Sequence, residues 1–522
     1  MLLATPWLAS VAMLAATNLG YRGMWWDEAA QFWVSQGLSS YSSPFSPPRG
    51  LRDVARMNCS ENLDPGGFSA LLRVWTAGGR GLVWLRALPF SFFVAASLAL
   101  GLLGWRLTRS PVFALAACAA PSFYPAFLYF AFEIRAYSME MSGVALGALA
   151  LDFFHERPST ARAILPGVVC AGFLTSRYSF IFAAVALAAA LWRASRREAG
   201  RRTALRTGVA FLLPASLIAL PVWWVTLSYQ LHPAMKGGPL GVSSPAYTRG
   251  AVLLHGANDL QLILRNLLSP QALPITLAIL AAVSVRRRVY ARLANGSRRP
   301  ELERIRERHA AFVPYIIGVQ LTSVVASALG LYPWDVASRW SAYLVALSAV
   351  AAVVLAAEAR SLVLVALADR NGAAAADRRL RIVEVTLAVA LVLSASARLM
   401  LHRQSVESTR RTNVALQIDR LPLASLGKHT VFVAFYEVPM VRYLYEYGPY
   451  RGRPEYPGVF RFETPAEWSA KIPFSFRTEG TAFIVSALSP AEAQARFPDA
   501  DVRPFGPDGG RLLVVSGRTG AS

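Results

Sequence analysis

The chain alternates long apolar runs with short polar segments, and most of the runs have the length of a membrane helix. About 20 apolar residues in a helix cross the hydrocarbon core of a bilayer. The pattern predicts about eleven transmembrane helices, of which the fifth and sixth are short. They are residues 3–20, 82–105, 111–130, 134–153, 162–176, 178–192, 207–229, 262–285, 310–330, 340–358 and 383–401. The chain is therefore predicted to be a polytopic α-helical membrane protein.

The long segment after the first run, residues 21–81, contains two amphipathic stretches. Residues 28–38 and 67–76 place aromatic and aliphatic side chains at helical spacing, which predicts two helices lying in the membrane interface. Between them, Ser-Ser-Pro-Phe-Ser-Pro-Pro predicts a turn-rich connection.

The pattern changes after residue 401, where short β-like runs alternate with helical segments. Strands are predicted at 430–436, 481–487 and 511–516, and helices at 437–446, 464–470 and 489–497. Residues 402–522 are therefore predicted to form a small α/β domain, joined to a membrane module of residues 1–401.

Composition supports the membrane assignment, and the distribution of charge adds an orientation. Hydrophobic residues make up 54% of the chain and charged residues 16%, against about 25% charged residues in soluble domains. The net charge of +22 would suit nucleic acid, but the arginines gather in short segments between apolar runs. Such clusters are typical of cytoplasmic loops and of contacts with anionic headgroups, so no nucleic-acid partner is expected.

The arginine clusters occur in every second loop when the N-terminus is placed in the cytoplasm. They include Arg106 and Arg109, Arg157 and Arg162, Arg193 to Arg206, the segment 286–308, and Arg360 to Arg381. The opposite face then carries the loop 21–81, the shorter loops 230–261 and 331–339, and the tail from residue 402. We predict a multi-pass protein of the bacterial inner (plasma) membrane with a cytoplasmic N-terminus and an extracytoplasmic C-terminal domain.

Three cysteines do not suggest a disulfide or a metal cluster. Cys118 and Cys170 lie in apolar runs, and Cys59 is expected in a polar loop. The first apolar run lacks a basic start and a clear cleavage site, so it is expected to be retained as a helix rather than removed as a signal peptide. The sequence also lacks a P-loop and a dinucleotide-binding fingerprint.

Asp27 and Glu28 are the strongest candidates for chemistry. They follow two tryptophans just after the first predicted helix, and charges beside hydrocarbon must be solvated, paired or used. A carboxylate there can accept a proton from an attacking hydroxyl or amine.

Further polar residues are predicted on the same outer face. They are Glu61, Asp64, Glu133, Arg135, Tyr137, Arg177, Tyr178, Lys236 and Arg339. Arginines near hydrocarbon stay charged and bind phosphate through two parallel hydrogen bonds, which suits an anionic lipid-linked group. Simpler explanations stand beside this one. Glu133 and Arg135 can anchor a helix end, Arg177 and Arg339 can extend to lipid phosphate, and Asp64 can belong to a plain turn.

Four segments in order along residues 1–200 resemble the GT-C glycosyltransferases, most of all the branch of protein O-mannosyltransferases and the lipid A aminoarabinose transferase. They are Trp25-Trp26-Asp27-Glu28-Ala29, Asp64-Pro65-Gly66-Gly67-Phe68, Leu85-Arg86-Ala87-Leu88-Pro89-Phe90 and Glu133-Ile134-Arg135-Ala136-Tyr137-Ser138. At the second segment the family often has His and a second Pro, where this chain has Asp64 and Gly66. That departure removes a His-dependent contact and leaves Asp64 as a third acid.

The resemblance implies transfer of a sugar from a polyprenyl-monophosphate carrier to a glycan, lipid or protein acceptor at the outer face. Asp27 would act as the base and Glu28 would support it, in an inverting reaction. Arg135, Tyr137, Arg177, Lys236 and Arg339 would contact the donor phosphate, and Asp64, Glu61, Glu133 and Tyr178 would serve the acceptor or complete the site. Some relatives bind a divalent metal, but the sequence offers no compelling ligand set.

Three other functions remain open at this point. A flippase or transporter of lipid-linked sugar would be expected to have two halves with broken helices, which the sequence does not suggest. A polymerase or ligase using a lipid-diphosphate donor would share the outer arginines without needing the acidic pair. A non-catalytic assembly subunit would tolerate loss of Asp27.

Overall fold

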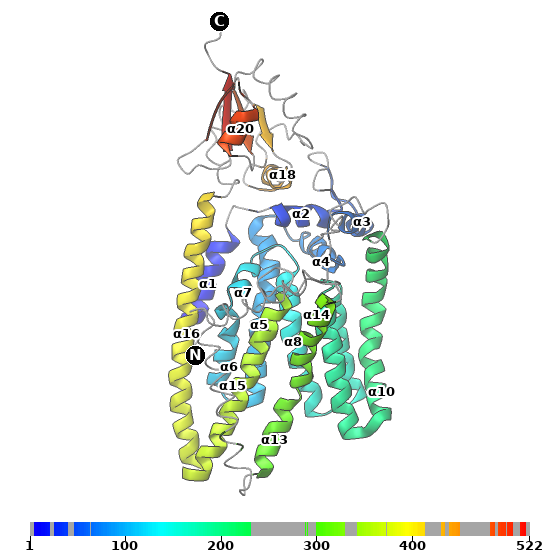
Figure 1. The fold of residues 1–522 in the computed structure, drawn as a ribbon, viewed down its shortest axis with the longest axis vertical. Coiled ribbons are helices and arrows are strands. Elements are labelled where there is room, and N and C mark those ends of the chain that lie inside the picture. Colours follow the sequence, from blue (N-terminus) through cyan, green and yellow to red (C-terminus); the bar gives the residue numbers. More distant parts are fainter. Residues whose placement is uncertain are drawn as a thin grey trace. The chain divides into compact units, whose positions relative to one another are not determined.

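The structure is a computed structural model, and its helices and strands form two compact units (Figure 1). Unit 1 comprises Met1–Ala15, Leu63–Phe68 and Ala87–Met400, and unit 2 comprises Ala16–Asn62, Ser69–Arg86 and Leu401–Ser522. The residues described are 5–20, 24, 26–39, 46–62, 64–230, 288, 290, 299–328, 342–371, 373–412, 430–433, 438–448, 451, 481–485, 489–496, 498, 500–504 and 512–517.

Long apolar helices dominate unit 1. Within the described ranges, five helices are long and apolar enough to cross a membrane. The helices that lie wholly or largely in this unit are α1 Thr5–Leu19, α5 Leu82–Thr108, α6 Pro111–Ala119, η1 Ala120–Phe123, α7 Pro125–Phe130, α8 Tyr137–Glu156, α9 Thr160–Leu174, α10 Phe180–Gln230, α13 Arg299–Ala310, α14 Val313–Ala328, α15 Ala342–Asn371 and α16 Ala373–Thr412. This confirms a polytopic helical membrane protein.

Helix α8 forms the buried centre of unit 1 and packs against α9, α10 and α15. Most of its side chains from Tyr137 to Phe154 are buried. The neighbouring pair α9 and α10 lie close together at Gly167, where an added Cβ would come within 2.3 Å of the Phe211 carbonyl oxygen. Only glycine allows this approach, and Figure 1 shows how the helices of the unit run alongside one another.

One predicted span differs in detail from the helices observed. The span predicted at 111–130 is divided into α6, the 3₁₀ turn η1 and α7, because Pro121 and Pro125 cannot donate the backbone hydrogen bonds of one continuous helix. The spans predicted at 178–192 and 207–229 correspond to the two helical stretches of α10, which are separated at Gly200, where φ is 80°. The span predicted at 262–285 lies outside the described residues.

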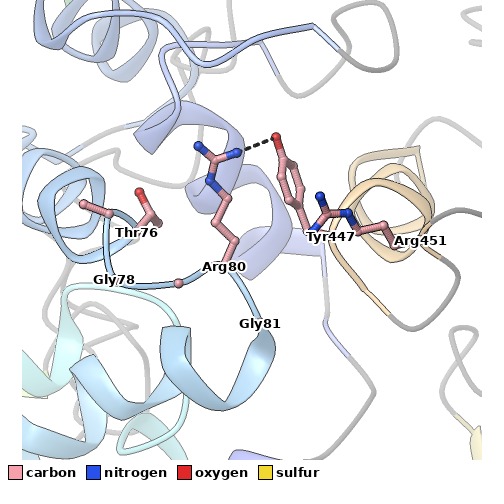
Figure 2. Close-up of a pocket in the computed structure, with 8 residues that line it drawn as sticks. Thr76, Gly78, Arg80, Gly81, Tyr447 and Arg451 are labelled. Atoms are coloured by element: carbon pink, nitrogen blue, oxygen red, sulfur yellow. Dashed lines mark hydrogen bonds between the residues drawn. The ribbon is translucent and has the colours of Figure 1, made fainter.

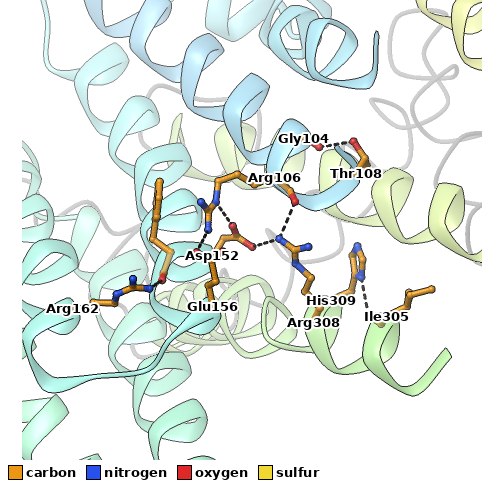
Figure 3. A network of polar contacts seen from close by, with 10 residues as sticks. Gly104, Arg106, Thr108, Asp152, Glu156, Arg162, Ile305, Arg308 and His309 are labelled. Carbon is orange, nitrogen blue, oxygen red and sulfur yellow. Dashed lines mark hydrogen bonds and ion pairs between the residues drawn. The ribbon is translucent and has the colours of Figure 1, made fainter. Parts of the chain in front are cut away.

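A polar network joins the ends of three unit 1 helices (Figure 3). Arg106, at the end of α5, pairs with Asp152 at 2.5 Å and with Glu156 at 3.1 Å, both on α8. Arg308 of α13 donates to the Arg106 carbonyl oxygen at 2.9 Å and lies 3.3 Å from Asp152. These contacts bind three segments that are distant in sequence.

Unit 2 begins with short amphipathic helices. They are α2 Trp26–Ser35, α3 Leu51–Glu61 and most of α4 Gly67–Trp75. The first and last correspond to the predicted interfacial helices, whereas α3 was not predicted. The expected loop around Cys59 is therefore wrong, because Cys59 lies in α3, where it is buried with Val54 and Asn58. Few apolar residues mark this helix, which is why its pattern is weak in the sequence.

The described residues in the rest of unit 2 include a four-stranded mixed sheet and two further helices. The strands are β1 Thr430–Val433, β2 Thr481–Val485, β3 Ala500–Pro504 and β4 Leu512–Gly517, in the order β1-β2-β4-β3. Strand β1 is parallel to β2, and β4 is antiparallel to both of its neighbours. The helices are α18 Val438–Glu446 and α20 Pro490–Arg496. The small α/β character of the tail is thus present.

Sequence patterns located most of these tail elements. Strand β3 was missed, because its charged residues and terminal proline are typical of an edge strand and break the apolar pattern. At the start of α20, Ser489 and Glu492 bond reciprocally as a capping box, with the Glu492 amide donating to the Ser489 hydroxyl at 3.3 Å. The helix predicted at 464–470 lies outside the described residues.

Candidate active site

The acidic pair occupies the first turn of α2 in unit 2. Asp27 and Glu28 are 5% and 4% exposed. Arg86, in the first turns of α5, lies 3.3 Å from the Glu28 carboxylate and also donates to the Asn18 carbonyl oxygen at 3.3 Å. A buried carboxylate needs such a partner, because removing its charge from water costs roughly several kcal/mol of free energy. Arg86 is therefore a charge partner of the buried Glu28 carboxylate.

Helix α18, which belongs to the same unit, reaches the same site. The Tyr443 hydroxyl donates to the Arg80 carbonyl oxygen at 2.7 Å. Burial raises the pKa of the Tyr443 phenol, and Arg86 and Glu28 lie close enough to act on its charge. Tyr443 therefore stays protonated at neutral pH and remains a hydrogen-bond donor beside the acidic pair.

Polar side chains fix α2 against the helices that follow it. Gln31 donates to the Ser69 hydroxyl at 2.7 Å, and Ser69 in turn donates to the Asn58 amide oxygen at 2.7 Å. Asn62 donates to Gln31 at 3.2 Å. Because these groups are buried, each bond replaces one lost to water. The network sets the position of the helix that carries the acids.

An aromatic and cationic contact packs α18 on α2. The Trp33 indole donates to the Pro439 carbonyl oxygen at 2.8 Å, and the Arg442 guanidinium lies 3.7 Å from the centre of the Trp33 ring. Arg442 also pairs with Glu446 at 2.7 Å. Phe32 meets Tyr443 edge to face, with ring centres 5.0 Å apart. The acidic pair and α18 are thus attached to the same helix.

A second cluster of predicted site residues lies in unit 1 around Arg177. This guanidinium is 2% exposed. It lies 3.5 Å from Asp64, 3.6 Å from Glu140 and 4.5 Å from the centre of the Tyr137 ring. Ser179 hydrogen-bonds to the other oxygen of Glu140. The sequence separates these residues widely, and the fold brings them together.

The cluster is assembled by close contact between two turns. The Gly67 amide donates to the Thr175 carbonyl oxygen at 2.7 Å, and a Cβ at Gly67 would lie 2.2 Å from the Thr175 hydroxyl. A side chain there would push the segment of Asp64 away from Arg177. The glycine in Asp64-Pro65-Gly66-Gly67 therefore has a packing reason.

The other predicted residues have different surroundings. Arg135 is partly exposed and lies 5.9 Å from the Tyr137 ring centre, while Glu133 is buried in the turn before α8. Tyr178 donates to Thr226 at 2.9 Å. Glu61 is the last residue of α3. Lys236 and Arg339 lie outside the described residues.

Two residues of these clusters were not among the sequence candidates. Arg86 belongs to a segment used for the family resemblance, yet its pairing with Glu28 was not foreseen. Glu140 carries the better signal, because an acid within an apolar helix marks a functional or paired position. Within the described part of the chain, His, Cys, Asp and Glu side chains do not gather in threes as metal ligands would.

The fold of this chain has a counterpart among solved structures. It is similar to the crystal structure of ArnT from Cupriavidus metallidurans bound to undecaprenyl phosphate, with a TM-score of 0.51 over 98% of both chains. The two sequences are 11% identical, so the likeness concerns the fold. No protein-family model matches the sequence, and no curated protein matches it.

Proposed function

We propose that this protein transfers a sugar from a polyprenyl-monophosphate donor to a glycan, lipid or protein acceptor at the extracytoplasmic face. The observation that carries the proposal is the buried pair Asp27 and Glu28, with Glu28 bound to Arg86. The GT-C fold supports it, as does the undecaprenyl phosphate bound to the similar ArnT.

The two acids have unequal roles in the proposed reaction. Successive helix residues project about 100° apart, so Asp27 and Glu28 address different neighbours. Glu28 is occupied by Arg86, which suits a residue that positions the site. Asp27 is the proposed base, which accepts the proton of the acceptor hydroxyl or amine as that atom attacks the sugar. The bond to the carrier phosphate breaks at the same centre, with inversion.

Cations would stabilise the departing carrier phosphate, because its negative charge grows in the transition state. Arg135 is the better candidate for direct contact, since its side chain is partly exposed beside Tyr137. Arg177 is buried between Asp64 and Glu140, which suits a positioning role. Lys236 and Arg339 are proposed as further anion contacts.

The test replaces Asp27 by Asn and measures transfer from a radiolabelled polyprenyl-phosphate sugar with membrane-reconstituted protein. Loss of a general base lowers turnover about 10²- to 10⁴-fold, while Asn keeps the size of the side chain. Asp53→Asn is the matched control, because Asp53 lies in α3 of the same unit and is only half-buried. Near-normal transfer by folded Asp27→Asn protein would overturn the assignment, and movement of intact donor without transfer would favour a flippase.

A further inference from the structure

A pocket of about 410 Å³ lies in unit 2, between the loop that follows α4 and the end of α18 (Figure 2). Its walls are Thr76, Ala77, Gly78, Gly79, Arg80, Gly81, Tyr447 and Arg451. None of the proposed catalytic residues is among them. The volume falls in the range of small-molecule sites, roughly 300–1,000 Å³.

The lining contains two cations and no carboxylate. Arg80 donates to the Tyr447 hydroxyl at 3.1 Å and lies 5.0 Å from the centre of its ring. Arg451 lies in the turn after α18. Its side chain is exposed and forms no ion pair with a described residue. Two guanidinium groups on one pocket favour an anion with several oxygens, because each guanidinium presents paired N–H donors.

Further donors lie beside the arginines. The Tyr447 hydroxyl accepts from Arg80, so its own proton is available for another acceptor. Four of the eight lining positions belong to the run Gly78 to Gly81, in which only Arg80 has a side chain beyond Cα. The Trp84 ring packs against Gly78 and Gly79, whereas a Cβ at Gly81 would meet nothing within 4 Å, so the backbone is open to a ligand at Gly81. Gly81 directly precedes α5, whose first-turn N–H groups add positive potential.

We propose that this pocket binds a phosphate-bearing group. A phosphate offers three strong acceptor oxygens, which match two guanidinium groups and a hydroxyl better than the two oxygens of a carboxylate do. The pocket is larger than the anion alone requires, so it also takes part of the molecule that carries the phosphate. A phosphorylated sugar and a phospholipid headgroup share this chemistry.

Tyr443 connects the loop of this pocket with the surroundings of the acidic pair. The Arg80 carbonyl oxygen accepts the hydrogen bond of Tyr443, and Tyr443 lies near Glu28 and Arg86. Occupation of the pocket would therefore fix the loop that supports Tyr443. Binding itself does not depend on sugar transfer, so the two proposals are tested separately.

The test measures binding of inorganic phosphate, glucose 6-phosphate and glucose to the full chain in phosphatidylcholine nanodiscs by calorimetry. Phosphate and glucose 6-phosphate are expected to bind and glucose is not. Arg80→Gln and Arg451→Gln are each expected to weaken binding of glucose 6-phosphate at least tenfold. Arg52→Gln is the control, since Arg52 is an exposed arginine of α3 in the same unit.

The Arg451→Gln variant guards against misfolding, because this exposed side chain has no packing role to lose. Binding that survives both substitutions, or wild-type protein that binds neither phosphate compound, would overturn the proposal. Asp27→Asn protein should bind glucose 6-phosphate as wild type does, even if transfer is lost. Phosphatidylglycerol nanodiscs separate the two sources. Weaker glucose 6-phosphate binding there assigns the pocket to a lipid headgroup, and unchanged binding assigns it to a soluble phosphorylated sugar.

Discussion

Glu28 and Arg177 illustrate how charge is held in the two clusters. Glu28 is buried beside one guanidinium, whereas Arg177 is buried beside two carboxylates. Removing one partner of such a pair leaves the other charge buried without compensation, which costs more than the pair contributes. The arginines that face these acids are therefore structural requirements of the sites, whatever chemistry they also support.

Arg86→Met makes this argument testable. The substitution leaves Glu28 buried without its guanidinium, and we expect unfolding to become easier by about 3–5 kcal/mol. Thermal unfolding of the purified protein, followed by fluorescence, measures the change. The double variant Glu28→Gln with Arg86→Met removes the uncompensated charge and should recover much of the loss. If the single variant were as stable as wild type, the ion pair would not be a support of the site.

At the residue scale, the sequence identifies charged residues whose burial costs free energy, but it does not identify their contacts. Asp27 and Glu28 stand out because acids beside tryptophans at a membrane boundary are rarely neutral choices. Their partner Arg86 lies 58 residues from Glu28 in the chain, and no local pattern encodes that meeting. Glu140 could have been singled out as an acid in an apolar helix. Its partner Arg177 lies in the turn between α9 and α10, and no local pattern connects the two.

Among the helices and strands, α2 is central to the proposed function. It carries the acidic pair, bonds to α3 and α4 through buried amides and hydroxyls, and receives α18 through Trp33. The helical segments at both ends of this contact were predicted from periodicity. Their packing was not, because Phe32, Trp33 and Tyr443 are compatible with any apolar surface, including lipid.

Trp33→Phe tests whether α18 is docked through this contact. Phenylalanine fills much of the space but cannot donate to the Pro439 carbonyl oxygen, which costs about 1 kcal/mol, and it weakens the contact with Arg442. Backbone amides of α18 should then exchange with deuterium faster, as followed by mass spectrometry. Trp224→Phe, a change at an exposed tryptophan of α10 in unit 1, should leave exchange in α18 as in wild type. Equal protection of α18 in both variants would exclude Trp33 as the anchor.

For the whole molecule, membrane orientation links sequence to structure most directly. Within unit 1 the network of Arg106, Asp152 and Arg308 joins segments that the arginine count assigns to the cytoplasmic face. Arg360 pairs with Glu384, between helices whose connecting loop was assigned to that face. The cluster of Asp64, Tyr137 and Arg177 joins segments assigned to the opposite face. Each group of contacts therefore joins segments that the prediction places on one face.

Chemical labelling of introduced cysteines tests that topology, and the native cysteines should contribute little background labelling. The three native cysteines are buried, and burial raises the pKa of the Cys59 thiol, so less reactive thiolate is present at neutral pH. Arg201→Cys lies at an exposed position in an arginine cluster predicted to be cytoplasmic, and Ala495→Cys lies at an exposed position of α20. In intact bacterial cells a membrane-impermeant maleimide should label Ala495→Cys and spare Arg201→Cys.

Permeabilised cells should label both variants, which shows that each thiol can react. The prediction depends on an odd number of crossings between Arg201 and Ala495, because only then do these two positions face opposite sides. Five spans are predicted between these two positions, at 207–229, 262–285, 310–330, 340–358 and 383–401. One of them failing to cross would place Ala495 and Arg201 on the same side, and the two variants would then label alike. That result would contradict the predicted placement of the tail on the face opposite the arginine clusters.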